Sequence, residues 1–292
     1  MRCATDPREN HLLAVLLGAE LRHLLPQLER VVMPVGQVLH ESGFAQNHLY
    51  FPTSAVVSLV CMTEDGATAE IAVIGNEGVA GISQILGGGT TTSQAVVQVA
   101  GEGFLLKAQT MREEFNRSAV VRGVLLRYTQ ALIAQMAQTA VCNRHHSVDQ
   151  QFCRLLLLCL DRLPGKELVV THESFAHMLG VRREGVTGSA GRLQKAGLIS
   201  CARGHILVLD REGIEKRACE CYAVVEKEYD RLLPKAEVKA VSGVEGRSDL
   251  THIYRHISAS GTKLPERQRA QQVKMTVPAD SIVETLNVVE QV

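Results

Sequence analysis

Hydrophobic and polar residues alternate along much of the first half of the chain, which is the pattern of β-strands with one buried face. Seven short runs rich in apolar and β-branched residues are separated by turn dipeptides such as Ser42-Gly43 and Asp65-Gly66. The runs are residues 30–32, 38–41, 48–51, 56–62, 68–73, 95–99 and 103–107. An amphipathic helix from Leu12 to Leu28 is expected before them. Many short strands without long intervening helices predict a β-sandwich or jelly-roll over residues 10–109.

A helical period begins at about Thr110 and extends to about Ala140. One edge of this expected helix is formed by side chains that recur at spacings of four and three: Leu125, Thr129, Leu132, Met136 and Thr139. Such an edge can pack on the barrel or on another helix. A further helix is expected over residues 148–163, and Pro164-Gly165 closes it.

The segment from Thr171 to Ile199 predicts two short helices joined by a tight turn. Thr171 can cap the first helix, and Gly180 permits the positive φ that ends it. The apolar positions at helical spacing are Phe175, Met178 and Leu179 in the first helix and Val186, Ala190 and Leu193 in the second. This is the arrangement of a helix-turn-helix.

The start of the second helix carries side chains that suit base edges in the major groove. Its exposed face is expected to hold Arg182, Arg183, Glu184, Thr187 and Gly188. Arginine bonds bidentately to guanine and glutamate accepts from cytosine, while His172 and Thr187 can hold phosphates. A hairpin over 200–210, with Arg203-Gly204 at its tip, would complete a winged helix-turn-helix over residues 146–233. The alternative is a small helical packing module with solvated arginines.

These residues resemble the Crp/Fnr family, the cyclic-AMP-receptor and fumarate-nitrate-reduction transcription regulators, over about residues 10–233. The resemblance implies an α+β fold with a cyclic-nucleotide-binding-type β-roll, a long dimerisation helix and hinge over 110–145, and a C-terminal winged helix-turn-helix. In that family an Arg, a Glu and, four residues later, an Arg commonly contact bases. The first two fall on Arg183 and Glu184, whereas the third falls on Gly188. The operator is therefore expected to differ from the consensus site of the best-known member.

The same resemblance implies the partners of the protein. The long helix of the family pairs with itself across a two-fold axis, and a palindromic operator needs a dimer. We therefore expect a homodimer, joined along the 125–139 edge, that binds double-stranded DNA at a two-fold operator. RNA polymerase is a further expected partner.

The expected effector pocket is an incomplete phosphate cassette. In the resembled rolls, a glycine and a glutamate precede a short helix and an arginine that pairs with phosphate. Glu77, Gly78 and Gly81 match that outline, but Ser93-Gln94 stands where the arginine is expected. A buried phosphodiester without a cation carries a desolvation penalty of several kcal/mol. The effector is therefore expected not to be cyclic AMP.

The formal net charge of zero conceals an asymmetry between two parts of the chain. Residues 31–106 contain no Lys or Arg but six acids, whereas residues 171–210 contain five bases against three acids. Only the basic part can gain from the release of phosphate counterions. This distribution fits a sensor roll attached to a DNA reader.

The eight cysteines form no C-x-x-C pair, which argues against a common metal motif. Cys219 and Cys221 stand two apart on an expected helix and should point in different directions. We predict no metal or other cofactor. The alternative is a metal- or thiol-based redox sensor, with DNA binding as its output, built on Cys142, His145 and His146, with Asp149 as a further candidate.

Other classes of function find little support in the sequence. No hydrolase, metalloprotease, Walker or dinucleotide motif is present, so no enzymatic activity is expected. No run reaches the roughly 18 apolar residues of a membrane span, so a cytoplasmic protein without a membrane partner is expected. Residues 234–292 are poor in large apolar residues, which predicts a tail of low order with a short helix at Ser281–Val289.

Overall fold

The computed structural model describes residues 6–16, 19–163 and 165–233. All of them belong to one compact unit, Met1–Glu237. The predicted tail over 234–292, with its helix at Ser281–Val289, lies outside the described residues. In the described ranges, no helix is both long and apolar enough to cross a membrane.

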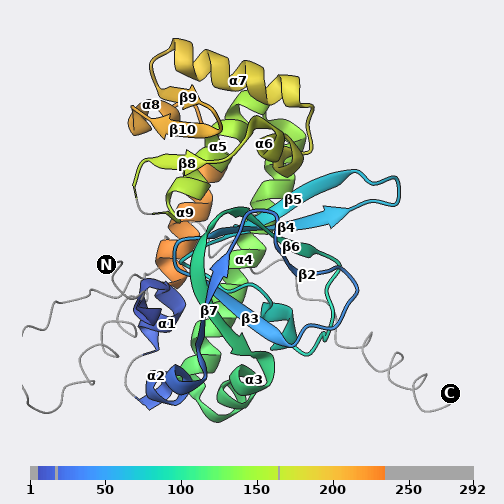
Figure 1. Cartoon of the computed structure of the whole chain (residues 1–292), viewed down its shortest axis with the longest axis vertical. Helices are drawn as coiled ribbons and strands as arrows, with labels where there is room; N and C mark the ends of the chain where they lie inside the picture. Colours follow the sequence, from blue (N-terminus) through green and yellow to red (C-terminus); the bar gives the residue numbers. More distant parts are fainter. Residues whose placement is uncertain (1–5, 17–18, 164, 234–292) are drawn as a thin grey trace, which may run out of the picture. The chain divides into compact units, whose positions relative to one another are not determined.

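Two antiparallel sheets form the N-terminal roll (Figure 1). One sheet has the strand order β1-β7-β3 and the other the order β2-β6-β4-β5. The strands are β1 Glu29–Met33, β2 Val38–His40, β3 His48–Pro52, β4 Val56–Met62, β5 Thr68–Ile74, β6 Gln94–Val99 and β7 Gly101–Lys107. Each lies on one of the seven predicted runs, so the alternating pattern located the strands correctly. The mixed α+β class with an N-terminal roll is confirmed.

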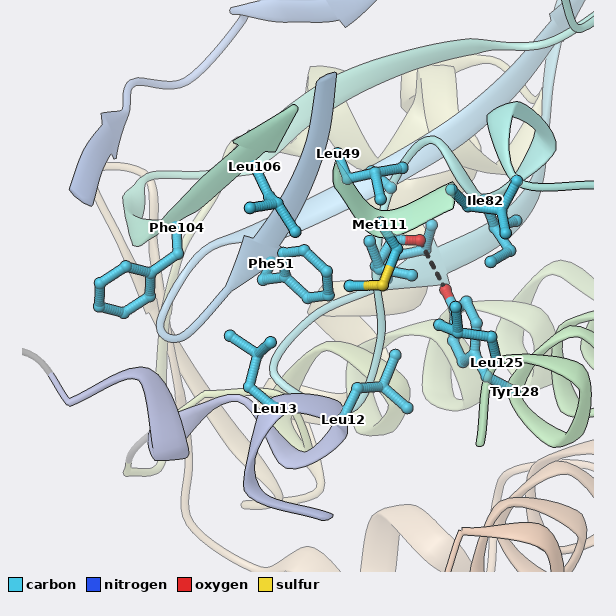
Figure 2. Close-up of a cluster of buried hydrophobic side chains, with 14 of the residues drawn as sticks. Leu12, Leu13, Leu49, Phe51, Ile82, Phe104, Leu106, Met111, Leu125 and Tyr128 are labelled. Atoms are coloured by element: carbon cyan, nitrogen blue, oxygen red, sulfur yellow. Dashed lines mark hydrogen bonds between the residues drawn. The ribbon is translucent and has the colours of Figure 1, made fainter. Parts of the chain in front are cut away.

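The core of the roll is built from the inward-facing residues of paired strands. On β3 and β7, Leu49 pairs with Leu106 and Phe51 with Phe104, and all four side chains are buried. Figure 2 shows these side chains together with Leu12 and Leu13, which come from the N-terminal helix. The burial of large apolar and aromatic side chains in one cluster supplies most of the stabilisation of such a domain.

The helices of the N-terminal segment are shorter than predicted. A 3-10 turn, η1 Pro7–Glu9, comes first, and in place of the expected helix from Leu12 to Leu28 the structure has α1 His11–Val15, α2 Ala19–Leu24 and η2 Leu25–Gln27. Leu16 leaves the helical region with ψ of 81° and is buried in the roll core. Pro26, which lacks an N–H, stands in the final 3-10 turn and cannot continue an α-helix.

The expected single helix from Thr110 is divided in two. The structure has α3 Ala108–Arg117 and α4 Ala119–His145. Ser118 between them is extended, with φ −106° and ψ 120°, and its Oγ accepts from the Val121 N–H. Serine competes with the helix for backbone hydrogen bonds, and it is therefore favoured at such a break. The long helix itself reaches His145, beyond the predicted end at Ala140.

The C-terminal part contains the expected helix-turn-helix and hairpin. Its elements are α5 Val148–Leu160, β8 Glu167–Val169, α6 His172–Leu179, α7 Arg183–Lys195, β9 Ile199–Ala202, β10 His205–Val208, α8 Arg211–Glu215 and α9 Glu220–Leu232. The sheet order is β8-β10-β9. Sequence reasoning expected one last helix over 212–233. It is broken because Asp210 caps α8 and the extended Cys219 starts α9.

The roll and the C-terminal part share a buried junction. Val56, Val73 and Val99 of the roll lie in one apolar cluster with α5. The Arg162 guanidinium, just after α5, donates from Nε to Glu77 Oε1 of the roll at 2.8 Å and from Nη1 to the Leu158 carbonyl at 2.7 Å. The two charged side chains are only 5% and 15% exposed. The same guanidinium lies 5.7 Å from the ring centroid of Tyr229 on α9.

We expect Glu77→Gln to lower the free energy of unfolding by about 3–5 kcal/mol, because it leaves the buried Arg162 charge uncompensated while keeping the size of the side chain. Urea denaturation followed by circular dichroism measures the change. The control is Glu228→Gln, since Glu228 pairs with Arg231 on the exposed surface of α9 and its loss should cost less than about 1 kcal/mol. Equal stabilities of the two variants would contradict a structural role for the junction pair.

Candidate DNA-binding interface

The two helices of the motif are bounded by the residues predicted to bound them. The Thr171 Oγ1 accepts from the Ser174 N–H at 3.0 Å and caps α6. Gly180 ends α6 with φ 64° in the left-handed region, which glycine adopts without strain. The chain then turns and begins α7 at Arg183, with Arg182 at the N-cap. Val186, Ala190 and Leu193 are buried as predicted.

The candidate base-reading residues lie at the exposed start of α7. Arg182, Arg183, Glu184 and Thr187 are exposed, and Gly188 is half-buried. Arg183 Nε lies 3.7 Å from Glu173 Oε2 of α6. His172 Nδ1 lies 3.2 Å from Thr187 Oγ1, which joins the two side chains expected to hold phosphates. Burial, reinforced by the Arg183 charge, lowers the pKa of His172, so its imidazole is neutral at pH 7.

A second cation lies beside Gly188, where the resembled family carries its third reading arginine. A Cβ on Gly188 would lie 3.3 Å from Arg192 Nη1. Arg192 is held by Asp149 of α5, with its Nε 2.7 Å from Asp149 Oδ2, and the same carboxylate accepts from Ser189 at 2.5 Å. Sequence reasoning missed this tie between α5 and α7. The spacing of four between Gly188 and Arg192 could have indicated that Arg192 lies beside Gly188, but no local pattern indicated its partner Asp149 on α5.

The hairpin beside the motif has the geometry of a wing. β9 and β10 are joined by the two residues Arg203 and Gly204, whose φ values are both positive, 48° and 83°. Two positive φ values in a two-residue loop match the twist of a hairpin. Arg203 is exposed at the tip. The tip is tied to the motif because the Gly204 carbonyl accepts from the Val170 N–H, one residue before Thr171, at 2.8 Å.

The roll also reaches the start of α7. The turn between β4 and β5, residues Gly66 to Thr68, lines one hollow together with Arg182, Arg183 and Glu184. A Cβ on Gly180 would lie 3.1 Å from the Thr68 carbonyl oxygen. α6 packs against β5, so the hairpin of the roll contacts the turn of the motif (Figure 1). No local sequence pattern indicated this long-range contact.

The residues of the expected effector pocket are placed in different surroundings. Gly81 and Ser93 line a cavity of about 230 Å³ between the roll and α4. Glu77 is bound to Arg162 instead. A Cβ on Gly78 would lie 2.7 Å from the Tyr128 ring, and Gln94 donates to Glu41 on the surface at 2.6 Å.

The cavity is lined mainly by aliphatic side chains of the roll and α4, and none of its described lining residues is Lys or Arg. Its one imidazole belongs to His40. Burial lowers the pKa of His40 to about 4, so this side chain is neutral at pH 7. The cavity therefore presents no positive charge to a ligand.

The edge of α4 expected to form the dimer is largely used within one chain. Leu125, Leu132 and Thr139 are 1%, 3% and 4% exposed, and Leu125 lies in the roll core beside Tyr128 (Figure 2). Thr129 and Met136 are half-buried. Three of the five residues of the predicted contact edge therefore pack within their own chain, and Thr129 and Met136 are its partly accessible members. A neighbouring face of α4 exposes Leu126, Ile133 and Val141 instead.

The cysteines and histidines are brought together in a set that differs from the predicted one. Cys142 and His146 at the end of α4 lie with Cys219 and Cys221 at the start of α9, and their potential ligand atoms are all within 4.8 Å of one another. His145 is exposed, and Asp149 is bound to Arg192. Cys219 and Cys221 converge because Cys219 is the extended N-cap, with ψ 164°, rather than a helical residue.

Comparisons with known proteins agree with this architecture. Residues 150–217 match the family described as the Crp-like helix-turn-helix domain. A protein from Eubacterium rectale, described as a regulator of the Crp/Fnr family, aligns with a TM-score of 0.56 and 18% identity, over 72% of this chain and 98% of that chain. FixK2 from Bradyrhizobium japonicum aligns with a TM-score of 0.58 and 13% identity, over 66% and 98%.

A CRP-family transcriptional regulator from Thermus thermophilus aligns with a TM-score of 0.52 and 20% identity, over 65% of this chain and 96% of that chain. A search of curated protein sequences found no match. The chain therefore carries a Crp-like helix-turn-helix domain in a structure that has the fold of the Crp/Fnr transcription regulators.

Proposed function

We propose that the protein is a homodimeric, sequence-specific DNA-binding regulator of transcription. The observation that carries this proposal is the exposed start of α7, which carries Arg183 and Glu184, in a chain that also has a wing hairpin with Arg203 exposed at its tip. The proposed division is a sensor roll over 10–109, a helix and hinge over 110–145, and a winged helix-turn-helix over 146–233. Such a regulator acts in the cytoplasm with RNA polymerase and has no enzymatic activity of its own.

Each side chain at the interface has a proposed role. Arg183 reads a guanine and Glu184 a cytosine, and Arg182 and Arg203 contact phosphates. Arg183 is free to reach DNA at little cost, because its contact with Glu173 is between exposed side chains and such pairs contribute less than about 1 kcal/mol. The neutral His172 keeps Nδ1 toward Thr187 and offers Nε2 to a phosphate.

The proposed dimer forms along the exposed apolar face of α4. Leu126, Ile133 and Val141 are 48%, 53% and 47% exposed, and spacings of seven and eight place them on one side of the helix. Three large apolar side chains in a row on the longest described helix favour a second copy of the same helix as their partner. A two-fold dimer presents two reading helices to a palindromic operator.

The proposed effector, where one acts, is an uncharged ligand in the cavity between the roll and α4. Gly81 and Ser93 supply polar contacts there, and apolar side chains of α4 close the other side. An anionic cyclic nucleotide would lose its hydration without gaining a cation. Movement of α4 on ligand binding would reach the dimer contact directly.

The second candidate function is metal- or thiol-based sensing with DNA binding as the output. One observation favours it, namely the cluster of Cys142, His146, Cys219 and Cys221. The cluster joins the end of α4 to the start of α9. Metal binding or thiol oxidation there would therefore act where the long helix meets the C-terminal part.

We expect Arg183→Ala to weaken binding to a selected operator by about 1–3 kcal/mol and to relax the preference for one guanine. Arg203→Ala should weaken binding to all sequences to a similar extent, because a wing phosphate contact carries no base information. Arg231→Ala is the control, since this arginine is exposed on α9. Titration of operator and scrambled duplexes by fluorescence anisotropy measures all three, and unchanged binding by Arg183→Ala would refute the groove assignment.

We expect Ile133→Asp to convert the dimer to a folded monomer, because it places two like charges near the two-fold axis. Affinity for a full palindrome should fall by a factor on the order of 10² to 10⁴, the avidity that two linked modules supply, while half-site binding persists. Val32→Asp on β1 is the matched control, with a parent side chain that is 70% exposed. Light scattering gives the mass, and a variant that stays dimeric would exclude this face.

We expect cyclic AMP and cyclic GMP to leave the melting temperature unchanged, because no cation lines the described cavity. A ligand at 100 times its dissociation constant would add about 2.7 kcal/mol of stability, which a thermal shift assay detects easily. A rise of several degrees at millimolar nucleotide would show that the cavity accepts the phosphate.

A further inference from the structure

Four side chains from two distant segments meet at the point where α4 ends and α9 begins. Cys142 and His146 are one helical turn apart at the end of α4, and Cys219 and Cys221 flank the first residue of α9. The Sγ atoms of Cys142 and Cys219 are 3.5 Å apart. The Sγ of Cys221 is 3.4 Å from His146 Nδ1. The three thiols are buried and His146 is half-buried, so the set is nearly closed to solvent.

These distances suit one ion at the centre of a tetrahedron. A zinc ion with bonds of about 2.3 Å to sulfur sets sulfur atoms about 3.8 Å apart. All four potential ligand atoms lie within 4.8 Å of one another. An iron–sulfur cluster would spread its cysteine ligands further, because several iron and sulfide atoms stand between them. Three thiols and one imidazole are a common ligand set of structural zinc sites.

Neighbouring groups hold the four side chains in the orientation that a metal needs. His146 turns Nδ1 toward the thiols, and its Nε2 lies 3.4 Å from a carboxylate oxygen of Glu220. A carboxylate on the far nitrogen fixes the tautomer of a metal-binding imidazole. The Gln138 amide donates to Cys221 Sγ at 3.1 Å. The Gln151 amide donates to the Cys142 and His146 carbonyls, which fixes the end of α4.

The buried positive charge of Arg154 near the four side chains also favours a bound metal. Zn²⁺ bound by three thiolates and a neutral imidazole carries a net charge of minus one. Arg154 is 2% exposed and donates to Thr139, which lies one turn before Cys142 on the same face of α4. Its Nε has no hydrogen-bond partner, and no ion pair of Arg154 occurs among the described residues. The buried Glu70 carboxyl also acts on this charge, but burial raises its pKa to about 7, so it is only partly ionised at neutral pH. A buried guanidinium needs a nearby negative charge, and the metal–thiolate group would supply it.

We propose that Cys142, His146, Cys219 and Cys221 bind a single Zn²⁺ ion in a closed tetrahedral site that clasps the end of α4 to the start of α9. Three thiols lose their protons to solvent as three zinc–sulfur bonds form, and His146 Nδ1 makes the fourth bond. No oxidation or reduction takes part. The site depends only on the geometry of one chain, so it stands whether or not α7 reads DNA.

The full-length chain, purified with a reductant, tests this directly. Elemental analysis should find one zinc per chain, and Co²⁺ in its place should give the strong visible absorption of tetrahedral thiolate coordination. Cys142→Ser and Cys219→Ser should each lower zinc affinity at least tenfold in competition with a chelator. Cys201→Ser and His145→Ala are matched controls from outside the cluster and should keep full occupancy.

Glu220→Gln gives a test that does not threaten the fold, because this side chain is 72% exposed. Loss of a partner behind a metal-bound histidine weakens metal binding by about 10- to 100-fold. Full occupancy in Cys219→Ser would overturn the proposal. The proposal would also be overturned if the reduced parent protein bound neither Zn²⁺ nor Co²⁺. This holds even if peptide mapping finds a Cys142–Cys219 disulfide in protein purified without reductant.

Discussion

The buried ion pair between Arg162 and Glu77 is the contact on which the joining of the two halves depends. A guanidinium that is 5% exposed must keep its carboxylate, so the end of α5 and the loop after β5 hold one another in place. The aromatic ring of Tyr229 covers the same cation from α9. Three segments that are far apart in sequence are thus fixed by one charge, and the helix-turn-helix takes its place relative to the roll from them.

The pairing of Glu77 with Arg162 also determines where the Glu77 carboxylate lies. In a phosphate cassette a glutamate and an arginine face the ligand, but here Glu77 faces the protein interior and is already neutralised. The cavity between the roll and α4, which Gly81 and Ser93 line, has no cation among its described lining residues. The carboxylate that stabilises the junction is therefore paired with a cation of its own chain. The described lining of this cavity therefore lacks the positive charge that the resembled phosphate cassette carries.

The sequence was most informative where local chemistry decides the structure. Strand alternation, the Thr171 cap, the Gly180 end and the Arg203-Gly204 turn each follow from a few neighbouring residues, and the structure has all of them. The face of α4 that packs on the roll could not be decided in this way, because Leu125 and Leu126 both belong to apolar stripes and only the roll determines which is buried. The cysteine cluster was missed because it depends on Cys219 standing outside the helix. The Arg162–Glu77 pair spans 85 positions and leaves no periodic signal.

The Thr68 carbonyl lies close to Gly180, so the roll and the end of α6 meet at this point. Gly180 ends α6 and leads directly into the turn before α7, so the β4–β5 hairpin lines one hollow with Arg182 and Arg183. The roll therefore packs directly against the helix-turn-helix at this point. A side chain at position 180 would meet the Thr68 carbonyl oxygen, so the roll can pack this closely on the end of α6 only because a glycine stands there.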